Sequence, residues 1–123
     1  MSRPRILCIS FDKTASDNRR DSLQEAGYEV TARTSVQEGL DLLSREKFDA
    51  VIVGHRFSSE ERYLLAVETE EKANTPVVLV CGTARDSEIP ASSRVFALEG
   101  NPGLLSALSR LCPAEAAARR EAA

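Results

Sequence analysis

Short runs of apolar, mostly β-branched residues recur along this 123-residue chain, and helix-like segments separate them. Four such runs cover residues 6–9, 50–53, 77–80 and 94–98. The first three are apolar throughout, which is typical of strands covered on both faces of a parallel sheet. A fifth run, residues 28–32, is half polar and predicts an edge strand. This pattern restricts the chain to folds in which strands and helices alternate.

The segments between these runs carry helix signals. Two capping-box patterns, each a serine followed three residues later by a glutamate, predict helices that begin after Ser35 and Ser58. Gly27 predicts the end of a helix over residues 16–26, and Pro102 predicts the first turn of the last helix. The alternation favours a single α/β/α three-layer domain with right-handed crossovers and helices on both faces of a parallel sheet.

Two segments depart from this regular alternation. Residues 83–93 include Pro90 and three serines, so we expect a shortened helix or an irregular loop there. Residues 113–123 are rich in alanine and predict a helix-prone or disordered tail. The folded domain is therefore expected to cover residues 1–112.

Composition restricts the classes of partner. The chain has 16 basic and 19 acidic side chains, and the net charge of −3 argues against a nucleic-acid-binding surface. No apolar run approaches the ~20 residues that span a bilayer, and the N-terminus does not resemble a signal peptide. Cys8, Cys81 and Cys112 lack metal-ligand spacing. We expect a soluble, cytoplasmic protein that binds neither nucleic acid nor membrane.

Residues 5–111 resemble the receiver domain of bacterial two-component response regulators. The likeness rests on the order and spacing of four segments, which match the family's first four strands and their approaches: residues 5–9, 27–30, 48–53 and 75–80. The resemblance implies a CheY-like, flavodoxin-like fold, doubly wound, with a five-stranded parallel sheet in the order 2-1-3-4-5. It also implies a site at the carboxyl ends of strands 1 and 3.

The residues that carry the chemistry of that family are replaced. In the family an acidic pair holds Mg²⁺, an aspartate accepts the phosphoryl group, and a hydroxyl group and a lysine contact the phosphate. The matching positions, in that order, are Ser10 and Phe11, Gly54, Cys81 and Glu99. All five groups are lost, so the resemblance predicts a degenerate pseudo-receiver.

The physical consequences of these replacements are direct. Gly54 has no side chain and cannot form an acyl phosphate. Mg²⁺ is usually held through one or two carboxylates, and Asp12 is the one carboxylate expected near this edge. Glu99 would repel an anion where the family has a cation. We therefore expect no catalytic residue, no enzymatic activity, no metal and no cofactor.

What remains is a surface for another protein. The resemblance places Phe96 at the strand-5 aromatic of the family's signalling face, and Ser106, Ser109 and Arg110 on the exposed side of the last helix. The expected function is a signalling module of a two-component, phosphorelay-type pathway that acts by phosphorylation-independent interaction with a signalling protein.

Two alternatives remain open at this level. One is a small-ligand or redox sensor that uses the crevice above strands 1 and 3, where Gly54 opens space and Cys81 supplies a thiol. The other is enzymatic: Ser10 with His55, the single histidine, as its base, or His55 as a phosphoacceptor. No Gly-x-Ser-x-Gly elbow supports the second alternative.

The remaining charged and glycine-rich patterns predict no further site. Arg19 and Arg20 are flanked by Asp17 and Asp21, which predicts a solvated helix face. The six glycines are scattered, so the chain has no glycine-rich phosphate loop.

Overall fold

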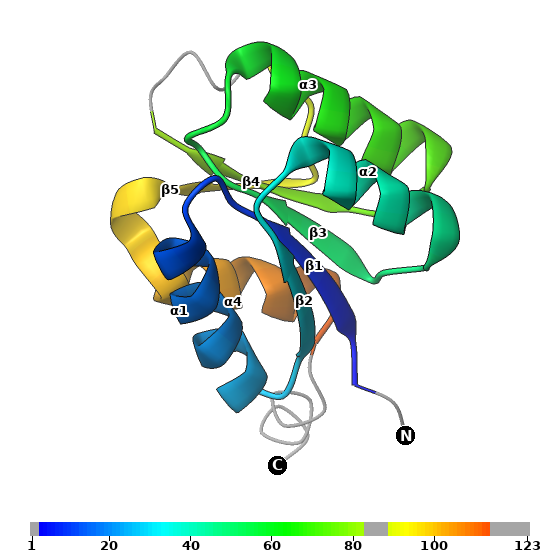
Figure 1. Ribbon diagram of the computed structural model, residues 1–123. Coiled ribbons are helices and arrows are strands. Elements are labelled where there is room, and N and C mark those ends of the chain that lie inside the picture. Colours follow the sequence, from blue (N-terminus) through cyan, green and yellow to red (C-terminus); the bar gives the residue numbers. More distant parts are fainter. Residues whose placement is uncertain (1–2, 83–88, 114–123) are drawn as a thin grey trace.

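Five parallel strands form the centre of the computed structural model, which describes residues 3–82 and 89–113 (Figure 1). Their order across the sheet is β2-β1-β3-β4-β5. The strands are β1 (Arg5–Ile9), β2 (Glu29–Arg33), β3 (Ala50–Val53), β4 (Val77–Cys81) and β5 (Ser93–Phe96). The expected flavodoxin-like α/β fold is confirmed, including the strand order.

Helices cover both faces of the sheet (Figure 1). The helices α1 (Lys13–Glu25) and α4 (Gly100–Leu111) pack on one face, and α2 (Val36–Arg45) and α3 (Ser59–Val67) pack on the other. A π-helical turn, η1 (Glu68–Lys72), extends α3, and a 3-10 turn, η3 (Ala97–Glu99), joins β5 to α4.

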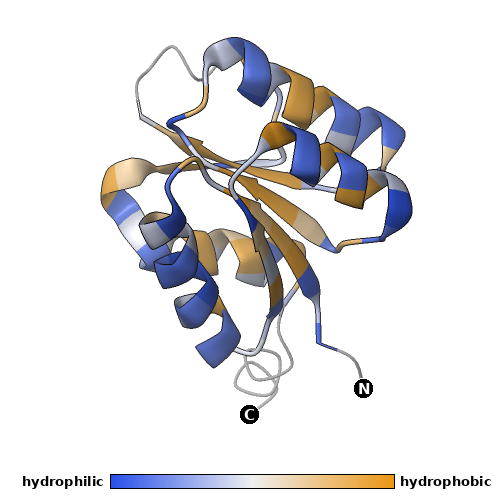
Figure 2. Cartoon of the chain, in the orientation of Figure 1, coloured by the Kyte–Doolittle hydropathy of each residue, from blue (hydrophilic) through white to orange (hydrophobic). Residues whose placement is uncertain are grey.

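Alternation along the strands divides the core between these two layers. Ile6 and Cys8 of β1 belong to the core beneath α1 and α4, whereas Leu7 and Ile9 belong to the core beneath α2 and α3. All four side chains are fully buried. Figure 2 shows the hydrophobic residues concentrated on the strands, whereas α1 is mostly hydrophilic.

The predicted helix starts are confirmed at both capping serines. Ser35 Oγ accepts a hydrogen bond from the Glu38 N–H at 3.4 Å. At Ser58 the box is complete, because Ser58 Oγ accepts from the Glu61 N–H and the Glu61 carboxylate accepts from the Ser58 N–H, both at 3.1 Å. These caps satisfy amide groups that lack partners in the first helical turn.

The first helix is longer than its pattern predicts. It begins at Lys13 rather than Ser16, because Asp12 accepts a hydrogen bond from the Thr14 N–H at 2.9 Å and caps the helix. It ends as predicted before Gly27, whose φ of 105° lies in the left-handed region that favours glycine.

The predictions for two segments fall largely outside the described residues. Of residues 83–93, expected as a short helix or loop, residues 83–88 lie outside. The described part is anchored to the core: Ile89 is buried, and the Ser92 N–H donates to the Val77 carbonyl at 2.9 Å. Of the predicted tail, residues 114–123 lie outside. Within the described residues, no helix combines the length and apolarity needed to cross a membrane.

Candidate functional site

The carboxyl ends of β1 and β3 bring Ser10 and Gly54 together. The two strands are paired so that Ile9 lies opposite Val53, and the Gly54 N–H donates to the Ile9 carbonyl at 2.9 Å. Ser10 is 2% exposed, and Gly54 is buried beside it. The site therefore lies at a strand-end crevice, where ligands bind in open α/β sheets.

A cation occupies the space above Gly54. Arg19 Nη1 donates a hydrogen bond of 2.7 Å to Ser10 Oγ. The same nitrogen lies 3.4 Å from the position that a Cβ atom on residue 54 would take. Side chains on a helix lean toward its N-terminus, so Arg19, near the middle of α1, reaches back to the strand ends.

The expected solvated face is therefore wrong for one of the two adjacent arginines. Arg20 does lie outward, where it pairs with Asp17 at 3.5 Å and with Asp21 at 3.6 Å. Arg19 is half-buried against the sheet. The sequence contained a signal for this position, because Arg19 lies four residues before the buried Leu23 and three after the buried Ser16, which places it on the inner side of α1.

A cavity of about 90 Å³ opens beside the Arg19 guanidinium. It is lined by Ser10, Phe11, Asp12, Ala15, Arg19, Gly54, His55 and Arg56. The volume is well below the ~300–1,000 Å³ of pockets that hold drug-sized ligands. It suits a few water molecules or one small ion.

The carboxylate that lines this cavity is already engaged. One Asp12 oxygen accepts the capping hydrogen bond from the Thr14 N–H, and the other pairs with Arg56 Nη1 at 3.7 Å. Over residues 3–82 and 89–113, no cluster of three or more His, Cys, Asp or Glu side chains could hold a metal ion. With Arg19 alongside, these residues do not fit the Mg²⁺ that the receiver fold implies, because two cations surround a single carboxylate.

Phe11, which the resemblance matches to an acidic position, points away from the core. It is 64% exposed and contacts the buried Phe57 edge-on, with ring centroids 6.0 Å apart. The contact fixes a phenyl group at the rim of the cavity, where the family places a metal-binding carboxylate.

Cys81 and Glu99, the other two matched positions, do not line the cavity. The Cys81 thiol is 3% exposed and donates to the Leu79 carbonyl at 3.8 Å. The Glu99 carboxylate turns back onto its own strand and accepts from the Phe96 N–H at 2.7 Å. The structure thus brings together Ser10, Phe11, Asp12 and Gly54 and leaves the other two apart.

The arrangement of Ser10 and His55 offers little to hydrolytic chemistry. Among the described residues, the Ser10 hydroxyl contacts Arg19 Nη1 and, at 3.6 Å, the Cys8 thiol. The His55 ring leans over Gly82 at the end of β4, since a Cβ atom on Gly82 would lie 3.2 Å from His55 Cδ2. A base that activates Ser10 would have to accept its proton, whereas Arg19 can only donate.

Two of the thiols are held in their protonated form. Burial raises the pKa of Cys8, and this effect outweighs the hydrogen bond from Ser10 and the charge of Arg19. Burial, and then the nearby charge of Asp49, raises the pKa of Cys112 to about 11. Neither group is a thiolate near neutral pH, and the thiolate is the form that reacts with oxidants.

The predicted interaction residues lie around the end of β5. Phe96 is 58% exposed, and the neighbouring Leu98 is fully exposed, so both present apolar side chains to solvent. On α4, the Ser109 hydroxyl donates to the Ser106 carbonyl at 2.8 Å, and Arg110 lies 3.5 Å from the Ser93 hydroxyl. The apolar surface here is therefore formed by Phe96 and Leu98.

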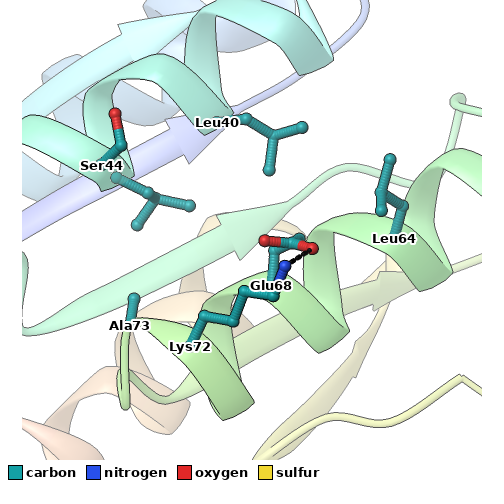
Figure 3. Close-up of a pocket in the computed structure, with 7 residues that line it drawn as sticks. Leu40, Ser44, Leu64, Glu68, Lys72 and Ala73 are labelled. Atoms are coloured by element: carbon teal, nitrogen blue, oxygen red, sulfur yellow. Dashed lines mark ion pairs between the residues drawn. The ribbon is translucent and has the colours of Figure 1, made fainter.

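A larger hollow of about 510 Å³ lies between α2 and the α3–η1 segment (Figure 3). Leu40 on α2 faces Leu64 on α3, Leu43 also lines the hollow, and an ion pair of 2.9 Å between Glu68 and Lys72 borders it. It lies between helices on one face of the sheet and shares no lining residue with the strand-end cavity.

No family model and no curated protein matches this sequence. Solved structures do match. Chemotaxis protein CheY4 of Vibrio cholerae is 18% identical, with a TM-score of 0.75 over 89% of this chain and 99% of that chain. Response regulator TrrA of Thermotoga maritima, solved in complex with Mg²⁺-BeF, is 20% identical, with a TM-score of 0.76 over 88% and 98%.

A third match is the receiver domain of a sensor histidine kinase from Pseudomonas aeruginosa, solved with a magnesium ion in its active site cleft. It is 17% identical, with a TM-score of 0.78 over 89% of this chain and 98% of that chain. These similarities concern the fold. The chain has the receiver-domain fold of two-component response regulators.

Proposed function

We propose that this chain is a signalling module of a two-component, phosphorelay-type pathway that acts by phosphorylation-independent protein–protein interaction. The proposal rests on one observation above all: Arg19 Nη1 lies 3.4 Å from where residue 54 would carry a Cβ atom and 2.7 Å from Ser10 Oγ. A cation stands where a receiver has its phosphoacceptor carboxylate.

Electrostatics supports this interpretation. Two of the similar receivers were solved with magnesium, and one of these also with BeF. Among the described residues that line the cavity, a divalent cation would meet Arg19 and Arg56 with one carboxylate, Asp12, to attract it, and Asp12 is already paired with Arg56. Charges attract and repel one another more strongly at a part-buried site than in open water, because water screens them less there. Loss of the metal and loss of the aspartate are therefore mutually consistent.

The direct test is covalent labelling. The protein is incubated with acetyl phosphate and Mg²⁺, and its intact mass is compared with that of a receiver that retains its aspartate, as a positive control. We expect no gain in mass. A Mg²⁺-dependent gain of one phosphoryl group would sink the proposal.

The partner is expected to contact the Phe96–Leu98 surface. Exposed apolar side chains grouped at one place are typical of interaction surfaces. In pull-downs that use the wild-type protein and its variants as baits, the wild-type protein should capture a signalling protein. The double variant Phe96→Ala, Leu98→Ala should fail to capture it. Tyr63→Ala, which removes an aromatic side chain of similar exposure (52%) from α3, should retain it. If both variants lost the partner equally, the result would contradict a contact at the Phe96–Leu98 surface.

A further inference from the structure

Arg19 carries a half-buried positive charge with no carboxylate partner among the described residues. Its hydrogen bond goes to the neutral Ser10 hydroxyl. A guanidinium has five N–H donors, and a charge that is partly removed from water is normally paired. The cationic group therefore has donors left over next to the strand-end cavity.

The lack of a described carboxylate partner distinguishes Arg19 from the arginines next to it in the sequence and across the cavity. Arg20, the next residue, is matched by Asp17 and Asp21 on the outer side of α1. Arg56, across the cavity, is matched by Asp12. Counting Arg19, Arg56 and Asp12 together, the charged side chains that line the cavity sum to +1. One negative charge would balance them.

The space beside Arg19 is of the right size for a small anion. The cavity measures about 90 Å³, and the missing side chain of Gly54 contributes to the room in front of the guanidinium. The planar guanidinium fork matches two oxygens of a carboxylate or a similar oxyanion. The Ser10 hydroxyl accepts from Arg19 and lies 3.6 Å from the Cys8 thiol, so it helps to hold the guanidinium in place beside the cavity.

We propose that this cavity binds a small oxyanion, of the carboxylate class, on the Arg19 guanidinium. The binding is non-covalent and needs no metal. A receiver site carries negative charge and attracts a cation, whereas this cavity carries positive charge and attracts an anion. The proposal is independent of the proposed protein interaction, since either can hold without the other.

The oxyanion has two possible sources, a free small molecule or a carboxylate on another protein. The first arm of the test uses sodium acetate as the probe, added to the full chain in the presence of a chelator, and follows amide and arginine Nε–H signals by NMR. Sodium chloride at equal ionic strength corrects for screening. The second arm uses a short peptide and the same peptide with an amidated C-terminus.

We expect acetate to shift the Ser10, Gly54 and Arg19 signals together and to saturate, with a dissociation constant on the order of millimolar for so small a ligand. Arg19→Gln should lower the affinity at least tenfold, and Arg20→Gln, the matched control, should leave it unchanged. If only the peptide with a free C-terminus produces the same shifts, the source is a protein carboxylate.

A second variant keeps the proposal testable if Arg19→Gln fails to fold. Gly54→Asp supplies a carboxylate from within the chain, so it should abolish the acetate shifts while the rest of the amide spectrum is retained. Shifts that do not saturate, that sodium chloride reproduces, or that persist in a folded Gly54→Asp variant would overturn the proposal. Because no Mg²⁺ or phosphodonor is present, these outcomes are distinct from those of the labelling test.

Discussion

Arg5 and Arg19 lie at opposite edges of the sheet, Arg5 at the amino edge where the parallel strands begin and Arg19 at the carboxyl edge where they end, and their charges are satisfied differently. At the amino edge, Arg5 pairs with Glu46 at 2.6 Å, donates to the Lys47 carbonyl at 2.9 Å, and lies 4.9 Å from the centroid of the Phe48 ring. At the carboxyl edge, Arg19 has, among residues 3–82 and 89–113, a single hydrogen bond, to the neutral Ser10 hydroxyl. The charge of Arg5 is therefore paired and contributes to stability, whereas the charge of Arg19 has no carboxylate partner among the described residues.

Truncation of the two arginines should separate these roles most clearly. Arg5→Ala removes an ion pair, a carbonyl hydrogen bond and a cation–π contact, and should lower the free energy of unfolding by about 1–2 kcal/mol. Arg19→Ala loses one hydrogen bond but also removes an unpaired charge, and should cost about 0.5 kcal/mol or less. Chemical denaturation of both variants measures the difference. An equal or larger loss in Arg19→Ala would contradict the comparison.

Supplying the missing carboxylate should make the carboxyl edge resemble the amino edge. Gly54→Asp places an acid beside Arg19 Nη1, although its Cβ atom would lie 3.3 Å from the Ile9 carbonyl oxygen, which is a tight contact. We expect a net gain of about 0.5–1 kcal/mol at pH 7 from the partly buried pair.

The pH dependence of the Gly54→Asp variant has a definite sign. Arg19 would lower the pKa of the introduced carboxyl group in the folded state below its unfolded value of about 3.9. The gain is therefore present at pH above that value and disappears as the pH falls through the folded-state pKa. Denaturation curves at pH 7 and pH 3 check it, with Gly54→Asn as the uncharged control. A gain that Gly54→Asn reproduces at both pH values would rule out the charge pair.

Cys112, whose pKa is raised by burial and by the charge of Asp49, predicts a smaller, pH-dependent effect on stability at the amino edge. Its pKa in the folded state is about 11, above the ordinary value of 9.0, so the folded chain holds this proton more tightly than the unfolded chain. Its contribution to stability is present below pH 9 and is lost as the pH rises toward 11. Cys112→Ser should flatten the alkaline decline in the denaturation midpoint. An unchanged decline would assign it to other groups.

The smallest effect is expected at the Phe96–Leu98 surface. Both side chains are exposed, so Phe96→Ala and Leu98→Ala should each change the free energy of unfolding by less than about 0.5 kcal/mol. Retained stability together with lost partner capture would mark an interaction surface. A loss above about 1.5 kcal/mol in either variant would assign that side chain to the core instead.

Most elements of the fold were predictable from the sequence because their signals are local, whereas the strand order was predicted from the resemblance to receiver domains. Continuous apolar runs marked β1, β3 and β4, and the capping serines at positions 35 and 58 marked the starts of α2 and α3. The π-helical turn after Val67 carries no comparable signal, since its residues are mostly glutamates that would suit an ordinary helix equally well.

The site was only half predictable. The resemblance to receiver domains implied the strand ends that carry Ser10 and Gly54, but it gave no indication of the group that occupies the space beside them. Arg19 reaches the site through a long, flexible side chain, from a helix that begins three residues earlier than its pattern predicts. The acidic residues that flank it, Asp17 and Asp21, indicate an outward position instead. Periodicity with Leu23 pointed inward, and packing decided between the two.

We propose that this site does not hold Mg²⁺, because Arg19 lies above Gly54 where a receiver has an acid, and is not phosphorylated, because Gly54 has no carboxylate to accept the group. The most direct measurement is an amide NMR titration with MgCl₂ followed by acetyl phosphate, with NaCl and acetate controls at matched concentration. We predict that Ser10, Asp12 and Gly54 show no Mg²⁺-specific saturable shift and no slow change after the phosphodonor. If these residues showed coordinated, saturable shifts with Mg²⁺, followed by a new set of signals with acetyl phosphate, the site would hold the metal and accept a phosphoryl group, and the proposal would be wrong.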